Sequence, residues 1–293
     1  MTVRQPSDQH SGTGSASAPG RSAGAKVPRR VTLGVGLAGG AVGALLGGGT
    51  GVVTVPALDR LTGLRRGMIH GTANLVNVAV AVVGSVIYGL RGGHLDARVG
   101  IGLMAGGILG AFLGARIAAW ASDQALRAAF TAVLAAAGVE LCLGAAGIGP
   151  SAGSPLLSAG VLASTSAVVV LTLAIGVVVG AWSAAMGLGG GSLTVPMLIL
   201  LFGVSGHTAE GTSLLVMLPN SVVASVQHLR QRTASLPLGA ALARGAAPGA
   251  VLGATVGLLL SGTVLDWVFG LFVLFVAAQQ VRRIQTIRRS RES

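Results

Sequence analysis

Long apolar runs separated by short polar stretches dominate this chain. Most runs approach or exceed the roughly 18 residues that mark a helix long enough to cross a bilayer. The pattern predicts an all-α, polytopic membrane protein. The expected segments cover residues 31–47, 52–62, 68–90, 98–119 and 125–147, then 165–187, 190–203, 208–229, 237–260 and 263–281.

Two of these segments, 52–62 and 190–203, are too short to cross a membrane comfortably as helices. Each follows a glycine cluster and contains a proline, and both residue types disfavour a continuous helix. We expect each segment to be one limb of a hairpin or a re-entrant element whose partner is the preceding helix. The pattern is compatible with a spanning limb and with a re-entrant one.

The two glycine clusters belong to an internal repeat. LGGGTGVVTVPAL occupies residues 46–58 and MGLGGGSLTVPML occupies residues 186–198. A shift of 140 residues superimposes their shared glycines and the Thr-Val-Pro that follows, placing Pro56 on Pro196. Duplicated halves that each carry a broken membrane helix are typical of transporters.

The repeat sets the domain organisation. We expect a disordered cytoplasmic tail (1–30), a first transmembrane repeat (31–147), a linker (148–164), a second transmembrane repeat (165–285) and a basic C-terminal tail (286–293). Each repeat also contains small residues at a four-residue spacing, which lets helix backbones approach closely in lipid. These packing glycines are Gly102, Gly106, Gly110 and Gly114, then Gly245, Gly249, Gly253 and Gly257.

Composition supports the membrane assignment. The 293 residues have a mean hydropathy of +0.79 and only 10% charged residues, whereas a soluble domain carries about 25%. The net charge of +12 lies in loops and tails rather than on one face, and aromatic residues are only 3%. These features do not favour a nucleic acid partner; the expected partners are the lipid bilayer and a small solute, with a homo-oligomer left open.

The placement of basic residues predicts the topology, because cytoplasmic loops collect Arg and Lys. With the N-terminus inside and five passes in each half, 17 basic residues lie inside and two outside. If each broken region counts as one pass, 14 lie inside and five outside. The first arrangement fits better and makes the halves an inverted repeat. Both place the two termini in the cytoplasm, but they put residues 148–162 on opposite sides.

A glycine-rich break inside a membrane exposes main-chain groups that lipid cannot satisfy. Helix N-termini at such a break present unpaired N–H groups and a partial positive charge, so two of them near the bilayer midplane would form an anion site. The candidate substrate-binding residues are Gly47, Gly48, Gly49, Thr50, Gly51, Thr54, Pro56, Thr72 and Asn77 in the first half, and Gly187, Gly189, Gly190, Gly191, Ser192, Thr194, Pro196, Thr212, Ser213 and Asn220 in the second.

Several of these residues have alternative interpretations. The glycine clusters would also allow tight packing alone. Thr72 and Thr212 would either cap the long helices that follow or face the site. We expect Glu210 to be solvated at a loop edge. Glu140, in an apolar stretch, is a candidate for proton coupling, since carboxylates inside membranes often carry protons.

Other chemistry finds little support in the sequence. GGGTG lacks the Lys-Ser/Thr of a phosphate-binding ATPase loop. We find no His/Asp/Glu cluster for a metal and no nucleophile triad. The single cysteine, Cys142, has no disulfide partner within the chain. We therefore expect no cofactor and no enzymatic activity.

The segment GLGGGSLTVPMLILLFGVSGHTAEGTSLL (187–215) and its weaker copy GGGTGVVTVPALDRLTGLRRGMIHGTANL (47–75) resemble the sulfite exporter TauE/SafE family of bacterial membrane proteins. The likeness spans about residues 31–285. The first copy departs from the family pattern, with Ile-His-Gly-Thr-Ala in place of Ala-x-Gly-Thr-Ser. The resemblance implies a multi-pass carrier linked to sulfite, sulfonates and other sulfur-containing anions.

The sequence thus predicts a secondary transporter of a small anion in the bacterial inner membrane. An anion channel and a non-transporting membrane sensor or assembly subunit are the alternatives. A secondary carrier is favoured because no ATPase motif is present.

Overall fold

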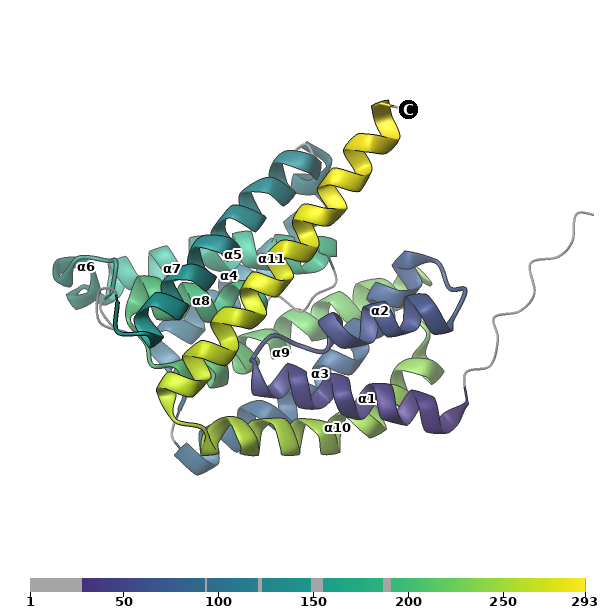
Figure 1. Cartoon of the computed structure of the whole chain (residues 1–293), viewed down its shortest axis with the longest axis horizontal. Coiled ribbons are helices and arrows are strands. Elements are labelled where there is room, and N and C mark those ends of the chain that lie inside the picture. Colours follow the sequence, from purple (N-terminus) through teal and green to yellow (C-terminus); the bar gives the residue numbers. More distant parts are fainter. Residues whose placement is uncertain (1–27, 93, 121–122, 149–154, 187–190, 293) are drawn as a thin grey trace, which may run out of the picture.

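The computed structural model describes residues 28–92, 94–120, 123–148, 155–186 and 191–292, and within them every regular element is a helix (Figure 1). The first half comprises α1 (Arg29–Leu45), α2 (Gly51–Leu61), α3 (Arg66–Gly92), α4 (Ala97–Trp120) and α5 (Asp123–Ala145). The second comprises α6 (Ala159–Ala163), α7 (Thr165–Met186), α8 (Gly191–Phe202), α9 (Gly206–Arg230), α10 (Leu236–Leu259) and α11 (Gly262–Glu292).

Ten of these helices correspond to the expected segments, and most of their ends agree within about two residues. The differences are the short helix α6, which the sequence does not predict, and α11, which continues well past residue 281 to Glu292. The extension of α11 is rich in Arg and Gln, which are good helix formers although they are polar. Most of the tail 1–30 lies outside the described residues.

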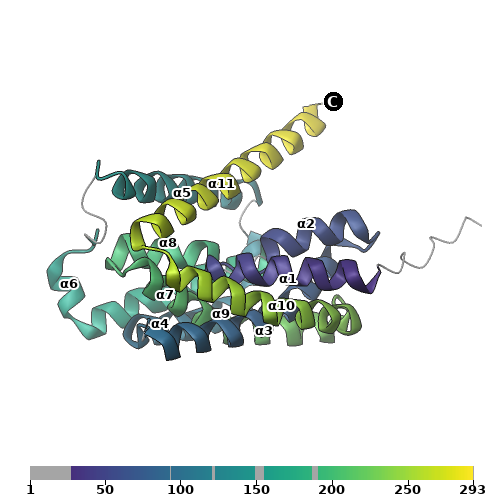
Figure 2. The ribbon, with the colours of Figure 1, turned by 60° about the horizontal axis from the view of Figure 1, so that its bottom comes forward.

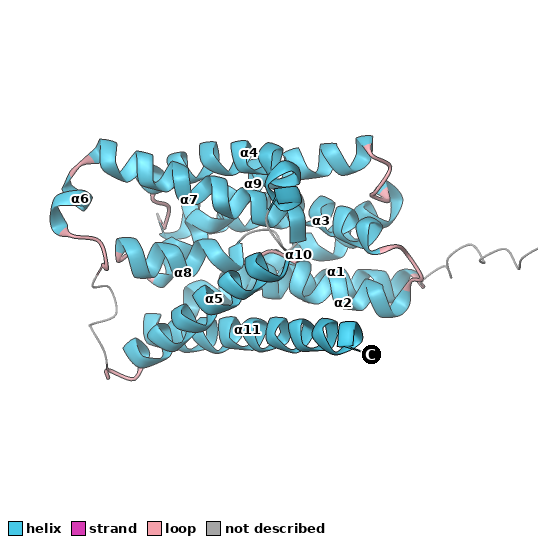
Figure 3. Cartoon of the chain, turned by 90° about the horizontal axis from the view of Figure 1, so that it is seen from above, coloured by secondary structure: helices cyan, strands magenta, loops and turns pink. Residues whose placement is uncertain are grey.

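The halves exchange helices rather than packing as separate bundles. α1 of the first half packs along α10 of the second, and α7 of the second half packs along α4 of the first (Figure 3). α3 and α9 pack against each other, with α10 against α3 and α4 against α9. Each of these pairings therefore has a counterpart in which the halves trade places, or, like α3 with α9, is its own counterpart. An internal repeat predicts this arrangement; the inversion of one half relative to the membrane stays a prediction.

The close helix pairs depend on glycine. On α1, a Cβ at Gly40 would collide with the main chain of Ala246 on α10. On α4, a Cβ at Gly106 would collide with Leu173 of α7. The same holds for the predicted positions Gly102, Gly110, Gly245, Gly249 and Gly253. The packing role of these glycines is confirmed. Gly257 differs, because it faces the hydroxyl of Tyr88, and the surroundings of Gly114 are outside the described residues.

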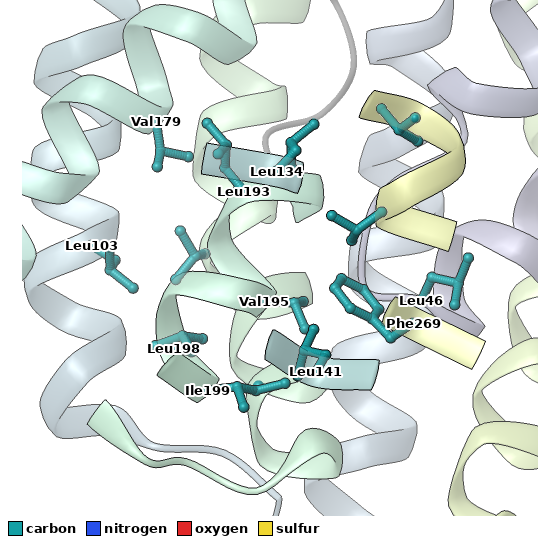
Figure 4. Packing of buried hydrophobic residues seen from close by; sticks show 14 of the residues in the cluster. Leu46, Leu103, Leu134, Leu141, Val179, Leu193, Val195, Leu198, Ile199 and Phe269 are labelled. Carbon is teal, nitrogen blue, oxygen red and sulfur yellow. The ribbon is translucent and has the colours of Figure 1, made fainter. Parts of the chain in front are cut away.

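The remaining long pair, α5 and α11, lies side by side along one flank of the molecule (Figure 2). The apolar core has two clusters. One surrounds α8, where Leu193, Val195 and Leu198 contact side chains that include Leu141 of α5 and Phe269 of α11 (Figure 4). The other surrounds α2 and α3. Each short helix is thus embedded in protein. This is expected, because lipid offers no hydrogen-bond partners for the main-chain groups that a helix break leaves free.

The outer surface is apolar. On α10 and α11, Leu252, Leu271 and Phe275 are each more than half exposed, and such surfaces are rare on soluble monomers. Among the described residues, α3, α9, α10 and residues 262–282 of α11 are long and apolar enough to cross a membrane. Parts of α4, α5 and α7, together with α8, form shorter apolar helices. The architecture is that of a multi-pass membrane protein.

Candidate functional site

The first helix break is present, and the start of α8 meets it. α1 ends at Leu45 and α2 begins at Gly51; α7 ends at Met186 and α8 begins at Gly191. A Cβ at Gly191 would collide with the main chain of Gly47 and Gly48, so the start of α8 lies directly on the first break. The candidates Gly187, Gly189 and Gly190 lie outside the described residues.

α1 and α2 form a hairpin too short to cross the membrane twice. α2 has 11 residues, which at the rise of an α-helix gives about 16 Å, about half of a hydrocarbon core. α1 and α2 lie toward one end of the molecule and α8 toward the other (Figure 3). Their contact at Gly191 therefore lies between the two ends. This geometry favours re-entrant limbs over spanning ones.

The first break has a defined conformation. Gly47 and Gly49 have φ angles of 57° and 80°, a region that side-chain-bearing residues rarely occupy. The Gly48 N–H donates to the Gly43 carbonyl at 3.2 Å. A Cβ at Gly43 would lie 2.9 Å from the carbonyl carbon of Gly49. The break is therefore a tight turn folded back onto α1, and glycine is required for the path of the main chain.

Asn77 on α3 holds the start of α2. Its Oδ1 accepts hydrogen bonds from the Thr50 N–H at 2.7 Å and from the Thr50 hydroxyl at 2.8 Å. A main-chain N–H can only donate, so the orientation of the Asn77 amide is fixed with its oxygen toward Thr50. Both donors of Thr50 are used within the protein. The Asn77 Nδ2 group consequently points elsewhere, and it is buried with no hydrogen-bond partner among the described residues.

Further donors at this break are also unpaired. The N–H groups of Gly49 and Gly51 make no hydrogen bond within the described part of the chain, and both residues are buried. The buried hydroxyl of Thr54, one turn into α2, has no partner there either. Asn74, one turn before Asn77 on α3, has an unpaired Nδ2. Buried polar groups nearly always have partners, so these unpaired donors on the first break, α2 and α3 are candidates for binding an acceptor.

The second half contributes buried polar groups from α8 and α9. Ser192 and Thr194 are both 2% exposed. Ser213 donates from its hydroxyl to the Gly47 carbonyl at 2.8 Å, which ties α9 to the first break. Pro56 and Pro196 lie inside α2 and α8, each five residues after the first residue of its helix. Neither therefore occupies the first helical turn, where proline costs least.

Thr72 and Thr212 have equivalent structural roles. Thr72 accepts a hydrogen bond from the Ser235 N–H at 3.1 Å, and Thr212 accepts one from the Asp96 N–H at 2.9 Å. Neither residue caps its helix, because α3 and α9 begin six residues earlier. The two hydroxyls anchor the α9–α10 and α3–α4 connections at positions that the repeat relates.

Two other candidate residues, Asn220 and Glu140, have no contact with the first break among those that the structure shows. Asn220 lies on α9 against Gly107 of α4, and its Oδ1 is buried without a partner among the described residues. Glu140 is half-buried on α5, a helix that packs against α11 and α8.

The expectation for Glu210 was wrong. Glu210 is not solvated but 1% exposed, and its Oε2 accepts a hydrogen bond from the hydroxyl of Tyr88 at 2.7 Å. The edge of an apolar run suggested a loop, but α9 begins four residues earlier and the α3–α4 connection covers this turn through His94, whose carbonyl would collide with a Cβ at Gly211. The signal that could have identified Glu210 is its acidic side chain directly before the buried Gly-Thr-Ser.

Sequence analysis also missed a pair of histidines near Glu210. The rings of His94 and His207 are stacked with centroids 5.3 Å apart. His94 lies in the connection between α3 and α4, where burial, and secondarily the nearby His207, lower the pKa of His94. His207 Nε2 lies 3.2 Å from the carbonyl oxygens of both Gly257 and Leu260. Within the described residues, no group of three or more metal-ligating side chains occurs.

Comparison with known proteins identifies the family. A family model described as "Sulfite exporter TauE/SafE" matches residues 2–141 and 171–293. The chain belongs to this family. It is similar to two proteins of Xylella fastidiosa, strains Temecula1 and 9a5c, each named "Probable membrane transporter protein". They are 31% and 30% identical over 256 residues, which cover 86% of this chain and 95% of each relative.

A further relative, "Probable membrane transporter protein YunE" of Bacillus subtilis strain 168, is 25% identical over 267 residues, covering 84% of this chain and 95% of the relative. No solved structure matches significantly. The family and its relatives support membrane transport rather than enzymatic catalysis, and the resemblance drawn from the repeated glycine motifs is confirmed.

Proposed function

We propose that the protein is a secondary carrier of a small anion, sulfite or a sulfonate, in the bacterial plasma membrane with both termini in the cytoplasm. The observation that carries the proposal is the cluster of unpaired donors at the first break. It combines the N–H groups of Gly49 and Gly51 with the Asn77 amide, and the unpaired Thr54 hydroxyl lies one turn further along α2, facing Gly39 of α1. Oxyanions accept such hydrogen bonds, and the N-terminus of α2 adds a partial positive charge.

The chemistry of the donors favours an ionised sulfur oxyanion. Main-chain N–H groups and the Asn77 Nδ2 group donate and cannot accept. An anion that keeps an acidic O–H at neutral pH needs an acceptor for it, whereas a sulfonate or fully ionised sulfite needs donors alone. The family description, which names sulfite, agrees with this preference.

The contact between α8 and the first break supports alternating access. Gly191 at the start of α8 packs on the turn between α1 and α2, and Ser213 bonds to the Gly47 carbonyl. An anion held at the turn is therefore adjacent to both halves. Rocking one half against the other would expose this site to either end in turn, as in other carriers built from repeats.

The test is anion binding by purified protein, followed by uptake into liposomes from a panel of sulfite, thiosulfate, sulfonates and carboxylates. In Asn77→Asp the retained oxygen still accepts from Thr50, but a carboxylate oxygen replaces the unpaired donor. We expect binding of sulfite and methanesulfonate to weaken at least tenfold, since a charge-assisted hydrogen bond contributes about 1.5–3 kcal/mol. Uptake measured at alkaline pH keeps the new carboxyl ionised.

The matched control is Ser85→Ala on the same helix, because the Ser85 hydroxyl donates to the Val82 carbonyl of its own helix and, among the described residues, to nothing else. It should bind and transport like the wild type. Unchanged affinity in Asn77→Asp would contradict the proposed site. Conductance that does not saturate would indicate a channel instead of a carrier, and the absence of any flux would favour a sensor or assembly subunit.

A further inference from the structure

Glu210, whose main chain contacts the first break, carries a buried carboxyl group. Glu210 has one oxygen bonded to Tyr88, while its Oε1 is buried with no hydrogen-bond partner among the described residues. Asp266 of α11, a second acidic side chain, is close enough to Glu210 to disfavour a negative charge on it. Burying an ionised carboxylate without a cation is costly, and such groups become neutral by binding a proton.

Glu210 is in direct contact with the first break. A Cβ at Gly47 would lie 3.0 Å from the Glu210 Cα and 3.1 Å from its main-chain oxygen. Ser213, three residues later on the same face of α9, donates to the Gly47 carbonyl. The main chain of α9 therefore connects the Glu210 side chain to the turn where the anion would bind.

A series of titratable groups leads from Glu210 toward the surface. His207 precedes Glu210 by three residues and shares its face of α9. Because carbonyl oxygens only accept, His207 Nε2 donates to Gly257 and Leu260, which leaves its Nδ1 to take up a proton. His207 is half-buried and stacks on the half-buried His94, while the neighbouring Ser205 is exposed.

The titratable groups around Glu210 come from α3, the α3–α4 connection and α11. Tyr88 comes from α3 and Asp266 from α11. The α3–α4 connection adds His94, which stacks on His207, and Asp96, whose N–H bonds to Thr212. Asp266, His94 and His207 are half-buried, whereas Glu210 is enclosed at 1% exposure. A proton path from the aqueous surface to a buried carboxyl requires such titratable groups along its way.

We propose that Glu210 is the proton-binding group that couples anion transport to proton movement, with His207 relaying the proton. The inference rests on the proposed function. A proton from the aqueous phase passes through the His207 ring to the Glu210 carboxylate, which becomes a neutral carboxylic acid. The anion then enters a site free of a neighbouring negative charge. Proton and anion move together, and loss of the proton on the far side restores the carboxylate and repels the anion.

The decisive variant is Glu210→Gln, which mimics the protonated state and keeps an oxygen to accept from Tyr88. The probe is methanesulfonate, whose charge is constant between about pH 5.5 and 8. In liposomes, wild-type protein should accumulate it when a pH gradient is imposed. We expect Glu210→Gln to retain methanesulfonate exchange within about twofold, while accumulation driven by the pH gradient is lost. Asp59→Asn, on the exposed end of α2, is the control and should behave like the wild type.

A second measurement does not depend on transport. The infrared difference spectrum between acidic and alkaline pH of purified protein should contain a carboxylic acid C=O band that is absent in Glu210→Gln. No difference between the spectra of the wild type and the variant would overturn the inference. Retained accumulation in Glu210→Gln, or its loss in Glu140→Gln instead, would also overturn it. If wild-type protein moves no anion at all, the proposed function fails, and the infrared result still decides whether Glu210 binds a proton.

Discussion

At the scale of one residue, replacing the hydroxyl of Thr54 distinguishes an effect on anion binding from an effect on folding. It is buried without a partner in the described part of the chain, so the free protein gains nothing from it. In Thr54→Val we expect the unfolding midpoint without anion to be unchanged or higher, because an unpaired buried group is removed. Sulfite affinity should fall about tenfold or more, since a hydrogen bond to the anion is lost. Thermal unfolding and equilibrium binding measure the two effects.

The matched control is Thr62→Val at the end of the same helix. The Thr62 hydroxyl donates to the Leu58 carbonyl at 2.6 Å and is therefore already satisfied. This variant should lose some stability and keep its sulfite affinity. Equal affinities in the two variants would remove Thr54 from the site, whatever their stabilities.

Local sequence patterns predicted helix breaks but not the burial or the hydrogen-bond partners of polar residues, because these depend on residues far away in the chain. The glycine clusters were identifiable because glycine and proline interrupt apolar runs locally. Glu210 was assigned wrongly because its burial depends on Tyr88 of α3, 122 positions away. The hydrogen bond between Asn77 and Thr50 could not be predicted from local sequence either, since it joins residues 27 positions apart. Membership in an apolar helix was predictable; the partner of each polar group was not.

At the scale of the helices, close packing through glycine makes a paired prediction on α1. Gly40 lies against the main chain of Ala246, whereas a Cβ at Gly34 would have nothing within 4 Å. Alanine at position 40 forces α1 away from α10, and overpacking costs about 1–3 kcal/mol. Alanine at position 34 should stabilise the helix by up to about 1 kcal/mol, because it removes the conformational freedom of glycine.

Thermal unfolding in detergent of Gly40→Ala and Gly34→Ala tests this pair. We expect a lower midpoint for the first variant and an equal or higher midpoint for the second. Similar shifts in both would show that α1 does not pack tightly on α10. The glycine spacing predicted that helices would pack closely, but it did not predict that α1 pairs with α10 of the other half. That choice depends on the tertiary fold.

The whole molecule is organised by the exchange between its halves. The anchoring bonds of Thr72 and Thr212 occur at positions that the repeat relates, and so do the pairs α1–α10 and α7–α4. The two copies of the repeat differ at polar residues near the first break: Glu210 corresponds to His70, and Ser213 corresponds to Ala73. We interpret the repeat as a symmetric scaffold. Its second half carries the titratable carboxyl of Glu210, and its first half carries the two side-chain amides of Asn74 and Asn77.

The orientation of this scaffold in the membrane is tested by labelling single cysteines in a Cys142→Ser background. If both hairpins re-enter, the chain returns to the cytoplasm after α2, so a cysteine at Gly63 is inside and a cysteine at Ser154 is outside. We expect an impermeant maleimide to label Ser154→Cys in intact cells and Gly63→Cys only after permeabilisation. If each hairpin crossed once, the two results would be reversed. The basic residues Arg60, Arg65 and Arg66 beside Gly63 favour the first outcome, because positive charge is retained on the cytoplasmic side.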